Sequence, residues 1–300
     1  MAKPSDPTRV SEMKGDISFS EEAQRAIDLA GKPGKNLFIT GKAGTGKSTL
    51  LEHIRMTPDQ KMIVLAPTGV AAINVKGETI HSFFKLKPGY ELDEAMNKRI
   101  DPEKTKGYKS IRTILVDEIS MVRADLLDAM DLFLRRARDN DEPFGGVQMI
   151  FFGDLFQLPP VLTNNDKQKY FSEYESPYFF SASVFHQRNL FNEAFRLEHI
   201  ELTHIYRQSD EKFIRLLNAI RDNSATEEDL MELNQHVDRD YMPPDEKPCV
   251  HLMATNATAN AYNLLKLGQL KTPSIEFQAT KKGKLGKLQP NESTITVKVG

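Results

Sequence analysis

The sequence predicts an α/β fold in which helices flank a parallel β-sheet. Short apolar runs recur along the first half of the chain, and patterns typical of helices separate them. Each run also passes into a polar loop that carries glycine or an acid. Strands that alternate with helices favour a parallel sheet with right-handed crossovers. Ligands of such sheets bind beyond the carboxyl ends of the strands, so we expect these loops to meet there.

The elements follow in order from residue 20. Ser20 has the character of a helix cap, because Glu21 and Glu22 follow it and an apolar stripe runs on to Gly31. Residues 122–137 form a second clear amphipathic pattern. Four apolar runs are interpreted as buried strands, namely residues 36–40, 62–65, 111–116 and 147–152.

The length of 300 residues predicts two domains at the usual size of about 100–200 residues each. We expect residues 1–17 to form a mobile arm and residues 18–194 to form the first domain, with an exposed, charged insertion at about 85–110. The α/β pattern restarts near residue 195 and continues to about 270. The elements expected in the rest of the chain are helices at 210–221, 226–237 and 256–267 and strands at 250–253 and 294–299.

Composition excludes several classes of protein. The formal net charge of −2 argues against binding nucleic acid through bulk charge, although a local basic groove is compatible with it. A single cysteine, Cys249, rules out a disulfide scaffold and a cysteine-based zinc site, and no HExxH pair is present, so we expect no structural metal. No apolar run reaches the roughly 18–20 residues of a membrane helix, and the first residues lack a signal-peptide core. We therefore expect a soluble, intracellular protein without membrane contact.

The strongest motif is GKAGTGKS at residues 41–48, which matches the phosphate-binding loop pattern G-x-x-x-x-G-K-[ST] between a predicted strand and a predicted helix. Its backbone N–H groups would cradle phosphates at the start of the helix. Lys47 is expected to reach the β- and γ-phosphates of ATP, and the Ser48 hydroxyl to ligate Mg²⁺. A flexible glycine turn is the alternative. The predicted nucleotide-binding residues here are Gly41, Ala43, Gly44, Thr45, Gly46, Lys47, Ser48 and Thr49.

Two further loops carry candidate catalytic side chains. Asp117 follows a buried strand and is placed to hold Mg²⁺ together with Ser48, while Glu118 beside it could orient and deprotonate the attacking water. Taken alone, such a pair is more often a solvated loop. Gln157, after the next strand, is a candidate for contact with the γ-phosphate or the water, although the loop by itself supports that role no better than a structural one.

Small residues, hydroxyls and aromatics follow the second predicted strand. Single-stranded nucleic acid is held by phosphate contacts and by stacking on aromatic rings, so these positions are candidates for binding it. The structural alternatives are that His81 is a hydrogen-bonded structural histidine and that Phe83 belongs to the core. The candidate residues are Pro67, Thr68, Gly69, Val70, Thr79, His81, Ser82 and Phe83.

Taken in order, these motifs resemble those of the Pif-type DNA helicases, the petite-integration-frequency family in the 5′-to-3′ branch of superfamily one. The resemblance rests on GKAGTGKST at 41–49, APTGVAA at 66–72, GETIHSFF at 77–84, VDEISMV at 116–122 and FFGDLFQLPPV at 151–161, and it extends from about residue 18 to 285. It implies that Gln24 contacts adenine and that Arg207 acts as an arginine finger on the phosphates. It also implies that Thr255 and Asn256 contact DNA.

The resemblance further implies a P-loop NTPase fold with two RecA-like motor domains, ATP between them and single-stranded DNA across both. Residues 195–270 would be the N-terminal part of the second motor, and residues 271–300 would begin an inserted SH3-like subdomain. Residues 85–110 would lie where the family has its strand-separating wedge. We find no late motif of the QG or SR type before Gly300, so we expect the chain to be truncated before the family's motifs V and VI.

Three functions stay open at this stage. The first is a monomeric 5′-to-3′ DNA helicase that couples ATP hydrolysis to movement on single-stranded DNA and to unwinding of forked or structured DNA. It would act in repair, recombination or telomere and genome maintenance. The second is a nucleotide-gated DNA-binding ATPase fragment without unwinding activity, and the third is an ATPase that acts on protein, for which Thr68, His81 and Phe83 would be dispensable. RNA is not excluded as a substrate. The expected location is the cytoplasm or nucleoid of a bacterium or phage host, or the nucleus or mitochondrion of a eukaryote.

Overall fold

The computed structural model describes residues 19–56, 61–87, 89, 91–97, 100, 102–162, 167–186, 195–206, 210–241, 249–280 and 293–299. The predicted arm at residues 1–17 lies outside these ranges. The chain divides into two units, Met1–Asp229 and Leu230–Gly300.

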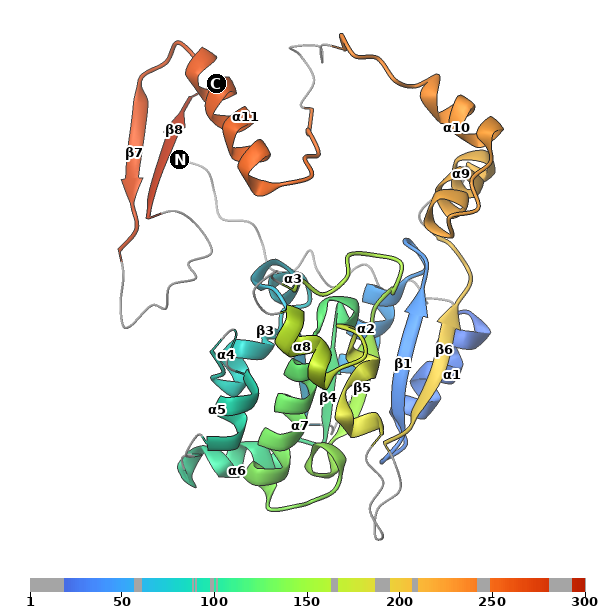
Figure 1. Cartoon of the computed structure of the whole chain (residues 1–300), viewed down its shortest axis with the longest axis vertical. Helices are drawn as coiled ribbons and strands as arrows, with labels where there is room; N and C mark the ends of the chain where they lie inside the picture. The colour runs from blue at the N-terminus through green and yellow to red at the C-terminus, as the bar shows by residue number, and fades with distance from the viewer. Residues whose placement is uncertain are drawn as a thin grey trace, which may run out of the picture. The chain divides into compact units, whose positions relative to one another are not determined.

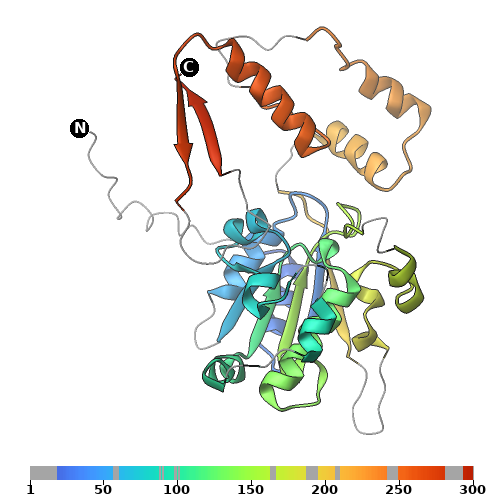
Figure 2. The ribbon, with the colours of Figure 1, turned by 60° about the vertical axis from the view of Figure 1, so that its left-hand side comes forward.

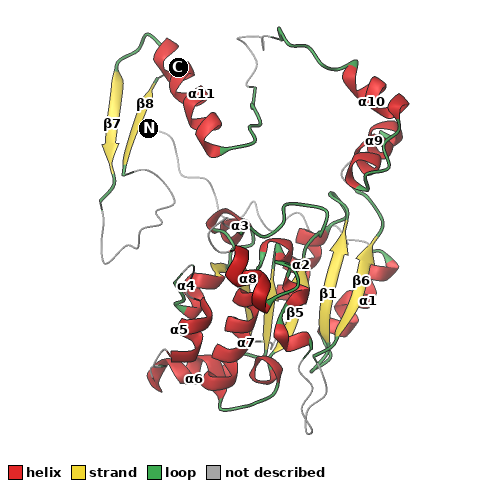
Figure 3. Ribbon diagram, in the orientation of Figure 1, coloured by secondary structure: helices red, strands yellow, loops and turns green. Residues whose placement is uncertain are grey.

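The first unit contains a six-stranded sheet in the order β3-β2-β4-β5-β1-β6 (Figures 1 and 3). Every neighbouring pair of strands in it is parallel. The strands are β1 (Asn36–Gly41), β2 (Met62–Ala66), β3 (Glu78–Thr79), β4 (Thr113–Val116), β5 (Gln148–Phe152) and β6 (Leu197–Leu202). The four strands predicted from apolar runs are therefore confirmed as β1, β2, β4 and β5, and the α/β class is confirmed with them.

Helices cover both faces of this sheet (Figure 2). Successive side chains of a strand point to opposite faces, so Leu37 and Ile39 of β1 pack with α1 (Glu21–Ala30) and α2 (Lys47–Arg55), whereas Phe38 packs on the side of α7 (Ala124–Arg138). Two separate apolar cores result, one on each face. This double burial explains why the strands appear in the sequence as continuous apolar runs.

Shorter helices complete the unit and carry the loops. Ser20 caps α1 as predicted, because its hydroxyl accepts the N–H of Ala23 at 3.3 Å. Further α-helices are α3 (Gly69–Asn74), α4 (Ile80–Phe84), α5 (Glu91–Asn97), α6 (Pro102–Ser110), α8 (Lys167–Glu173) and α9 (Glu211–Arg221). The division between the two units falls within α10 (Glu227–Asn234). Within the described residues, 3₁₀ turns lie at Ile119–Met121, Pro143–Gly146, Phe179–Ser181 and Ser183–Phe185.

Two expectations about the first unit need correction. The stretch that begins near residue 195 was assigned to the second domain, but Leu197–Leu202 pairs with β1 through all six of its residues. The first sheet thus extends past residue 194, and the division between the units falls after Asp229. The insertion at 85–110 is not wholly exposed either, because Leu86 and Ala95 belong to the core beneath α7. Its role as a wedge stays a prediction.

The second unit contains α11 (Asn256–Gln269) and an antiparallel hairpin of β7 (Ser274–Gln278) and β8 (Thr294–Lys298). The predicted helix at 256–267 and the predicted strand at 294–299 are confirmed within a residue or two. The strand expected at 250–253 is wrong: Val250 and Leu252 are 83% and 93% exposed and pair with no strand in the described part of the unit. The RecA-like and SH3-like assignments of 195–270 and 271–300 stay predictions. None of the helices in the described ranges is long and apolar enough to cross a membrane.

Candidate functional site

The phosphate-loop motif connects β1 to α2, and its glycines are required by geometry. Gly41 has φ 155°, and a Cβ there would come within 2.7 Å of both the Leu202 carbonyl oxygen and the Thr45 hydroxyl. Gly44 and Gly46 have φ values of 82° and 85°, in the left-handed region that favours glycine. Gly46 is also the residue before the first turn of α2. The loop therefore brings the chain from the sheet into a helix N-terminus in a conformation that other residues adopt only with strain.

Lys47 and the first turn of α2 make this loop a candidate for binding anions. The first N–H groups of a helix have no partner within the helix, and the helix dipole is positive at this end. The Lys47 ammonium group lies back on the loop and donates to the carbonyl oxygens of Gly41 at 2.5 Å and Lys42 at 3.1 Å. Burial lowers the pKa of Lys47, while the negative charges of Asp154 and Glu118 oppose that shift. A phosphate group could replace those two carbonyls as the partner of the ammonium.

Asp117 and Glu118 follow β4 at the same edge of the sheet. The N–H of Asp117 donates to the Leu65 carbonyl of β2 at 2.9 Å. This hydrogen bond fixes the position of the chain where β4 ends and the loop begins. Burial raises the pKa of Asp117 to about 6, and the neighbouring Glu118 charge adds to the shift. Glu118 itself has φ 51° and ψ 44°, an uncommon conformation for a residue other than glycine. A cation bound beside Asp117 would offset the electrostatic cost of this arrangement.

The residues present fit a magnesium ion that is held together with a nucleotide. Ser48 is exposed at the start of α2. Asp117 supplies a carboxylate, and the positive charge of Lys47 is not enough to keep the pKa of that carboxylate in its usual range. In the described ranges no group of three or more His, Cys, Asp or Glu side chains is placed to hold a metal ion. Magnesium is commonly bound through one or two protein oxygens plus the phosphates of the substrate, so it needs no such cage.

Asp154, after β5, links the remaining loops and is not among the site residues predicted from the sequence. It is 2% exposed, and its carboxylate accepts from Arg221 Nη2 at 2.8 Å and Arg221 Nε at 3.3 Å. The N–H of Phe156 and the side-chain amide of Gln157 also donate to it, at 3.1 and 3.4 Å. Burial alone would raise the pKa of Asp154, but the hydrogen bonds and the charge of Arg221 hold it below its usual range. The predicted Gln157 is thus tied to an ionised aspartate whose charge also acts on Lys47.

Arg221 is the second functional candidate that sequence reasoning missed. It lies 67 residues beyond Asp154, at the end of α9, and its guanidinium carbon is 4.1 Å from the centre of the Phe156 ring. The side chain therefore combines a bidentate ion pair with a cation–π contact. The only signal in the sequence was Asp154, an acid two residues after a strand, which could have prompted a search for a basic partner.

The structure does not test the roles of two residues that were assigned through the family resemblance, Gln24 and Arg207. Gln24 is exposed on α1, where its amide donates to Asp28 at 2.9 Å. Arg207 lies outside the described residues. Its neighbour Tyr206 donates its backbone N–H to the Gly44 carbonyl at 2.9 Å, and the Tyr206 ring passes over Gly46. The chain thus reaches the phosphate loop immediately before Arg207.

Several predicted nucleic-acid residues also have structural roles in the first unit. Thr68 and Thr79 are the N-caps of α3 and α4, and each hydroxyl accepts a backbone N–H at 3.2 Å. Phe83 is partly buried, with its ring 4.9 Å from that of Phe84 and 5.5 Å from that of Tyr108. The core alternative raised for Phe83 therefore has support. By contrast, Val70 is 73% exposed and Gly69 is exposed beside it.

The other predicted nucleic-acid-binding residues also include both partly buried side chains and side chains with structural hydrogen bonds. Pro67 is partly buried at the end of β2 and His81 is partly buried on α4, while the Ser82 hydroxyl donates to Glu78 at 2.5 Å. Thr255 and Asn256 belong to the second unit. There the Thr255 hydroxyl caps α11 by accepting the N–H of Thr258 at 3.2 Å. The structure thus places Asp117 and Glu118 within electrostatic range of Lys47, and it joins Gln157 to Asp154. The catalytic, nucleotide-binding and nucleic-acid roles of these residues stay predictions.

Comparison with known proteins identifies relatives of the whole arrangement. The model of the PIF1-like helicase family matches residues 19–230. The ATP-dependent DNA helicase RRM3 of Saccharomyces cerevisiae is 32% identical over 270 residues, and the match covers 88% of this chain and 35% of that protein. The human ATP-dependent DNA helicase PIF1 is 35% identical over 209 residues, covering 69% of this chain and 30% of that protein. The chain thus spans about a third of the length of these relatives.

Solved structures agree with the family match. The Pif1 helicase from Bacteroides in complex with ADP-AlF3 and single-stranded DNA superposes with a TM-score of 0.77 at 33% identity, covering 95% of this chain and 65% of that one. The Pif1 helicase from Candida albicans gives 0.76 at 28% identity, covering 95% and 64%. The similarity therefore extends over nearly the whole length of this chain.

Proposed function

The chain belongs to the PIF1-like helicase family, and from this premise we propose that it acts as an ATP-dependent DNA helicase that moves 5′ to 3′ on single-stranded DNA. The observation that carries the proposal is the convergence of Lys47, Asp117, Glu118 and Asp154 around one helix N-terminus at the carboxyl edge of the sheet. Such a cluster of one lysine and several acids beside a phosphate loop is what phosphoryl transfer requires.

Each side chain has a distinct role in the proposed hydrolysis. Lys47 and the amides of the loop bind the β- and γ-phosphates, so developing negative charge meets fixed donors. Ser48 and Asp117 would hold Mg²⁺, which when bound neutralises phosphate charge. Glu118 orients the attacking water and accepts its proton. We propose that Gln157, whose side-chain amide donates to Asp154, contacts the water or the γ-phosphate.

Two roles come from the family and have indirect support. We propose that Arg207 contributes its guanidinium to the phosphates as an arginine finger. The contact between Tyr206 and Gly44 supports this, because it brings the preceding residue onto the phosphate loop. We also propose that Gln24 contacts adenine. Its exposed amide is tied only to an exposed aspartate one turn along α1, a weak interaction that a nucleotide base could replace.

DNA would be bound by loops of the first unit and by the start of α11. The exposed positions Gly69 and Val70 support contact with a DNA strand. The Thr68 and Thr79 hydroxyls already cap α3 and α4, so they would have to bind DNA phosphates while they keep those capping hydrogen bonds. Thr255 and Asn256 would make the corresponding contacts from the second unit. Solved Pif1 relatives were crystallised with single-stranded DNA and studied at forked duplexes, which supports these substrates for this chain.

The wider role is a proposal from the family resemblance. We propose a monomeric intracellular enzyme whose unwinding of forked or structured DNA serves repair, recombination or telomere and genome maintenance. Residues 195–270 would include part of a second RecA-like motor, after β6, and residues 271–300 the start of an SH3-like insertion.

Steady-state ATP hydrolysis by the 300-residue chain, with and without oligo-dT, tests the proposal. Lys47→Ala is the blank, and Lys266→Gln is a matched control because that lysine lies on α11, outside the phosphate loop. We expect oligo-dT to increase turnover by the chain and by Lys266→Gln, and not by Lys47→Ala. Hydrolysis that DNA leaves unchanged would contradict the proposal and favour an ATPase that acts on another substrate.

A further inference from the structure

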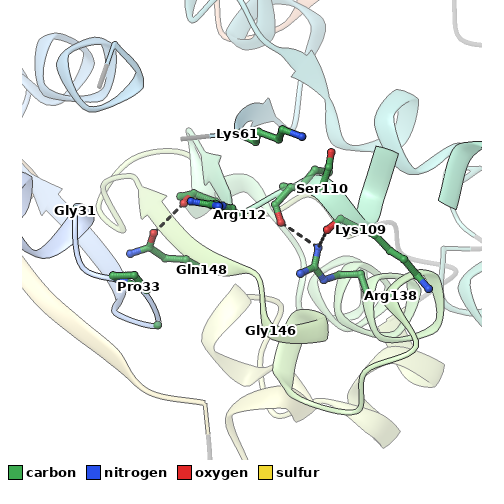
Figure 4. Close-up of a pocket in the computed structure, with 12 residues that line it drawn as sticks. Gly31, Pro33, Lys61, Lys109, Ser110, Arg112, Arg138, Gly146 and Gln148 are labelled. Atoms are coloured by element: carbon green, nitrogen blue, oxygen red, sulfur yellow. Dashed lines mark hydrogen bonds between the residues drawn. The ribbon is translucent and has the colours of Figure 1, made fainter. Parts of the chain in front are cut away.

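A hollow of about 660 Å³ opens at the edge of the first sheet opposite the phosphate loop. Its walls come from the segments that lead into β1, β2, β4 and β5, together with the end of α7 (Figure 4). The strands β1, β2, β4 and β5 have four to six residues, which places the hollow about 13–20 Å from the carboxyl edge at roughly 3.3 Å per residue. It is therefore separate from the nucleotide site.

The lining of the hollow is strongly basic. Lys61, Lys109, Arg112 and Arg138 all contribute to it, and none of the twelve lining residues is acidic. Within the described residues, Lys61, Lys109 and Arg112 form no ion pair and donate no side-chain hydrogen bond. Like charges that share a concave surface repel one another, and low-dielectric walls strengthen their field. An anion bound in the hollow would relieve this repulsion.

The walls are held rigidly by two hydrogen-bond networks. The buried Gln148 amide donates to the carbonyls of Lys32 at 3.0 Å and Lys35 at 2.8 Å, and its oxygen accepts from Thr113 at 2.8 Å. The chain before β1 is thereby attached to β4 and β5. A site whose walls need no rearrangement binds its ligand without an ordering cost.

Arg138 builds the other wall in the same manner. Its Nε donates to the Gly145 carbonyl at 2.6 Å, and its Nη1 donates to the carbonyls of Tyr108 at 2.7 Å and Ile111 at 3.0 Å. These bonds join α6, β4 and the turn before β5. These bonds go to neutral carbonyls, so the guanidinium keeps its positive charge at the wall of the hollow.

From this combination we propose that the hollow is a second anion site, which takes a phosphate-bearing ligand. The volume suits one or two phosphates with their sugars, since ligand sites commonly measure about 300–1,000 Å³. The lining contains no aromatic ring on which a base could stack, so the phosphate and not the base is the recognised group. The ligand is either a free polyphosphate or the backbone of a nucleic-acid strand that leaves the proposed helicase site.

The test uses the full chain in a Lys47→Ala background, which disables the phosphate loop. Lys61→Gln/Arg112→Gln removes two charges from the hollow at exposed positions, and Lys167→Gln/Lys169→Gln removes two from α8 as the matched control. Pyrophosphate binding is measured by titration calorimetry, and binding of a long oligo-dT by fluorescence anisotropy over a range of salt concentrations. Lys109→Gln is a second variant in case the double variant folds poorly.

We expect the hollow variants to lose at least about tenfold in affinity for one of the two probes, with the α8 control unchanged. Loss of pyrophosphate binding identifies a free polyphosphate as the ligand. Loss of oligo-dT binding alone identifies a nucleic-acid strand as the ligand. The slope of log Kd against the logarithm of the salt concentration should then fall by about 1.4, which is about 0.7 for each of the two phosphate contacts removed. The proposal is overturned if the parent binds neither probe, or if the hollow variants bind both probes as tightly as the parent. DNA-stimulated ATP hydrolysis by the chain with an intact Lys47 is independent of all these outcomes.

Discussion

The two edges of the first sheet are built in opposite ways. At the carboxyl edge the loops contain left-handed glycines, Glu118 at φ 51° and a carboxyl group on Asp117 whose pKa is about 6. At the amino edge Gln148 and Arg138 satisfy a series of backbone carbonyls with ordinary hydrogen bonds. Backbone strain and a raised carboxyl pKa therefore occur together at the edge where a nucleotide would bind, whereas the far edge has walls fixed by ordinary hydrogen bonds and a basic lining. One sheet can thus carry a strained site at one edge and an unstrained, basic hollow at the other.

The largest expected effect is on turnover at the carboxyl edge. Glu118→Gln retains the shape of the side chain but cannot accept a proton, so we expect ATP hydrolysis to fall by about 10²–10⁴-fold while nucleotide affinity stays within a few fold. Steady-state hydrolysis and binding of a fluorescent ADP analogue measure the two quantities. A variant that hydrolyses ATP at more than a tenth of the parent rate would remove Glu118 from the mechanism.

The next effect concerns stability at the amino edge. Gln148→Leu leaves the carbonyls of Lys32 and Lys35 and the hydroxyl of Thr113 without their partner, so we expect the free energy of unfolding to fall by about 2–4 kcal/mol. Arg112→Gln, an exposed neighbour, should change it by less than about 0.5 kcal/mol. Urea unfolding followed by circular dichroism measures both. If the two variants had equal free energies of unfolding, the hydrogen bonds of Gln148 would not stabilise the amino edge of the sheet.

The motifs of the first sheet could be predicted from the sequence, whereas contacts between distant residues could not. The motif GKAGTGKS and the acids after β4 were predictable because phosphate binding imposes residue types at fixed spacing within one strand, loop and helix. The pair of Asp154 with Arg221 was not, since its members are 67 residues apart and no local pattern joins them. The place of β6 in the first sheet was missed for the same reason: its pairing with β1 spans about 160 residues, so its partner cannot be read from neighbouring positions. The wrong strand at 250–253 shows the converse, because an apolar run forms a strand only where another strand can pair with it.

A smaller effect of opposite sign is expected at Asp117. Its pKa is raised in the folded protein, so the folded state holds the proton more tightly than the unfolded state, and ionisation destabilises the fold above about pH 6. Asp117→Asn should therefore raise the free energy of unfolding at pH 7 by about 2 kcal/mol, from about 1.4 kcal/mol per pKa unit with a discount for partial exposure. The gain should shrink as the pH falls from about 6 to 4. Urea unfolding at several pH values measures it, and a gain that does not depend on pH would contradict the assignment.

The smallest effect is expected at the pair that joins α9 to the carboxyl edge. Arg221→Gln removes the cation that keeps the pKa of the buried Asp154 low, and should lower the free energy of unfolding by about 1–2 kcal/mol at pH 7. Because the folded pKa is depressed, the stabilisation from this pair is present above the pKa of an unfolded aspartate, about 4, and is lost as the pH falls below it. The difference between variant and parent should therefore narrow in acid. Lys212→Gln, on the same helix, is the control.

The most direct test of the account is calorimetric titration of the chain with magnesium ADP, compared among three proteins. The account assigns the nucleotide to the carboxyl edge alone, so Lys47→Ala should lose at least about tenfold in affinity, equivalent to about 1.4 kcal/mol. Lys61→Gln/Arg112→Gln at the amino edge should bind like the parent chain. Retained affinity in Lys47→Ala, or an equal loss in the amino-edge variant, would contradict the division of the sheet into a nucleotide edge and a separate far edge.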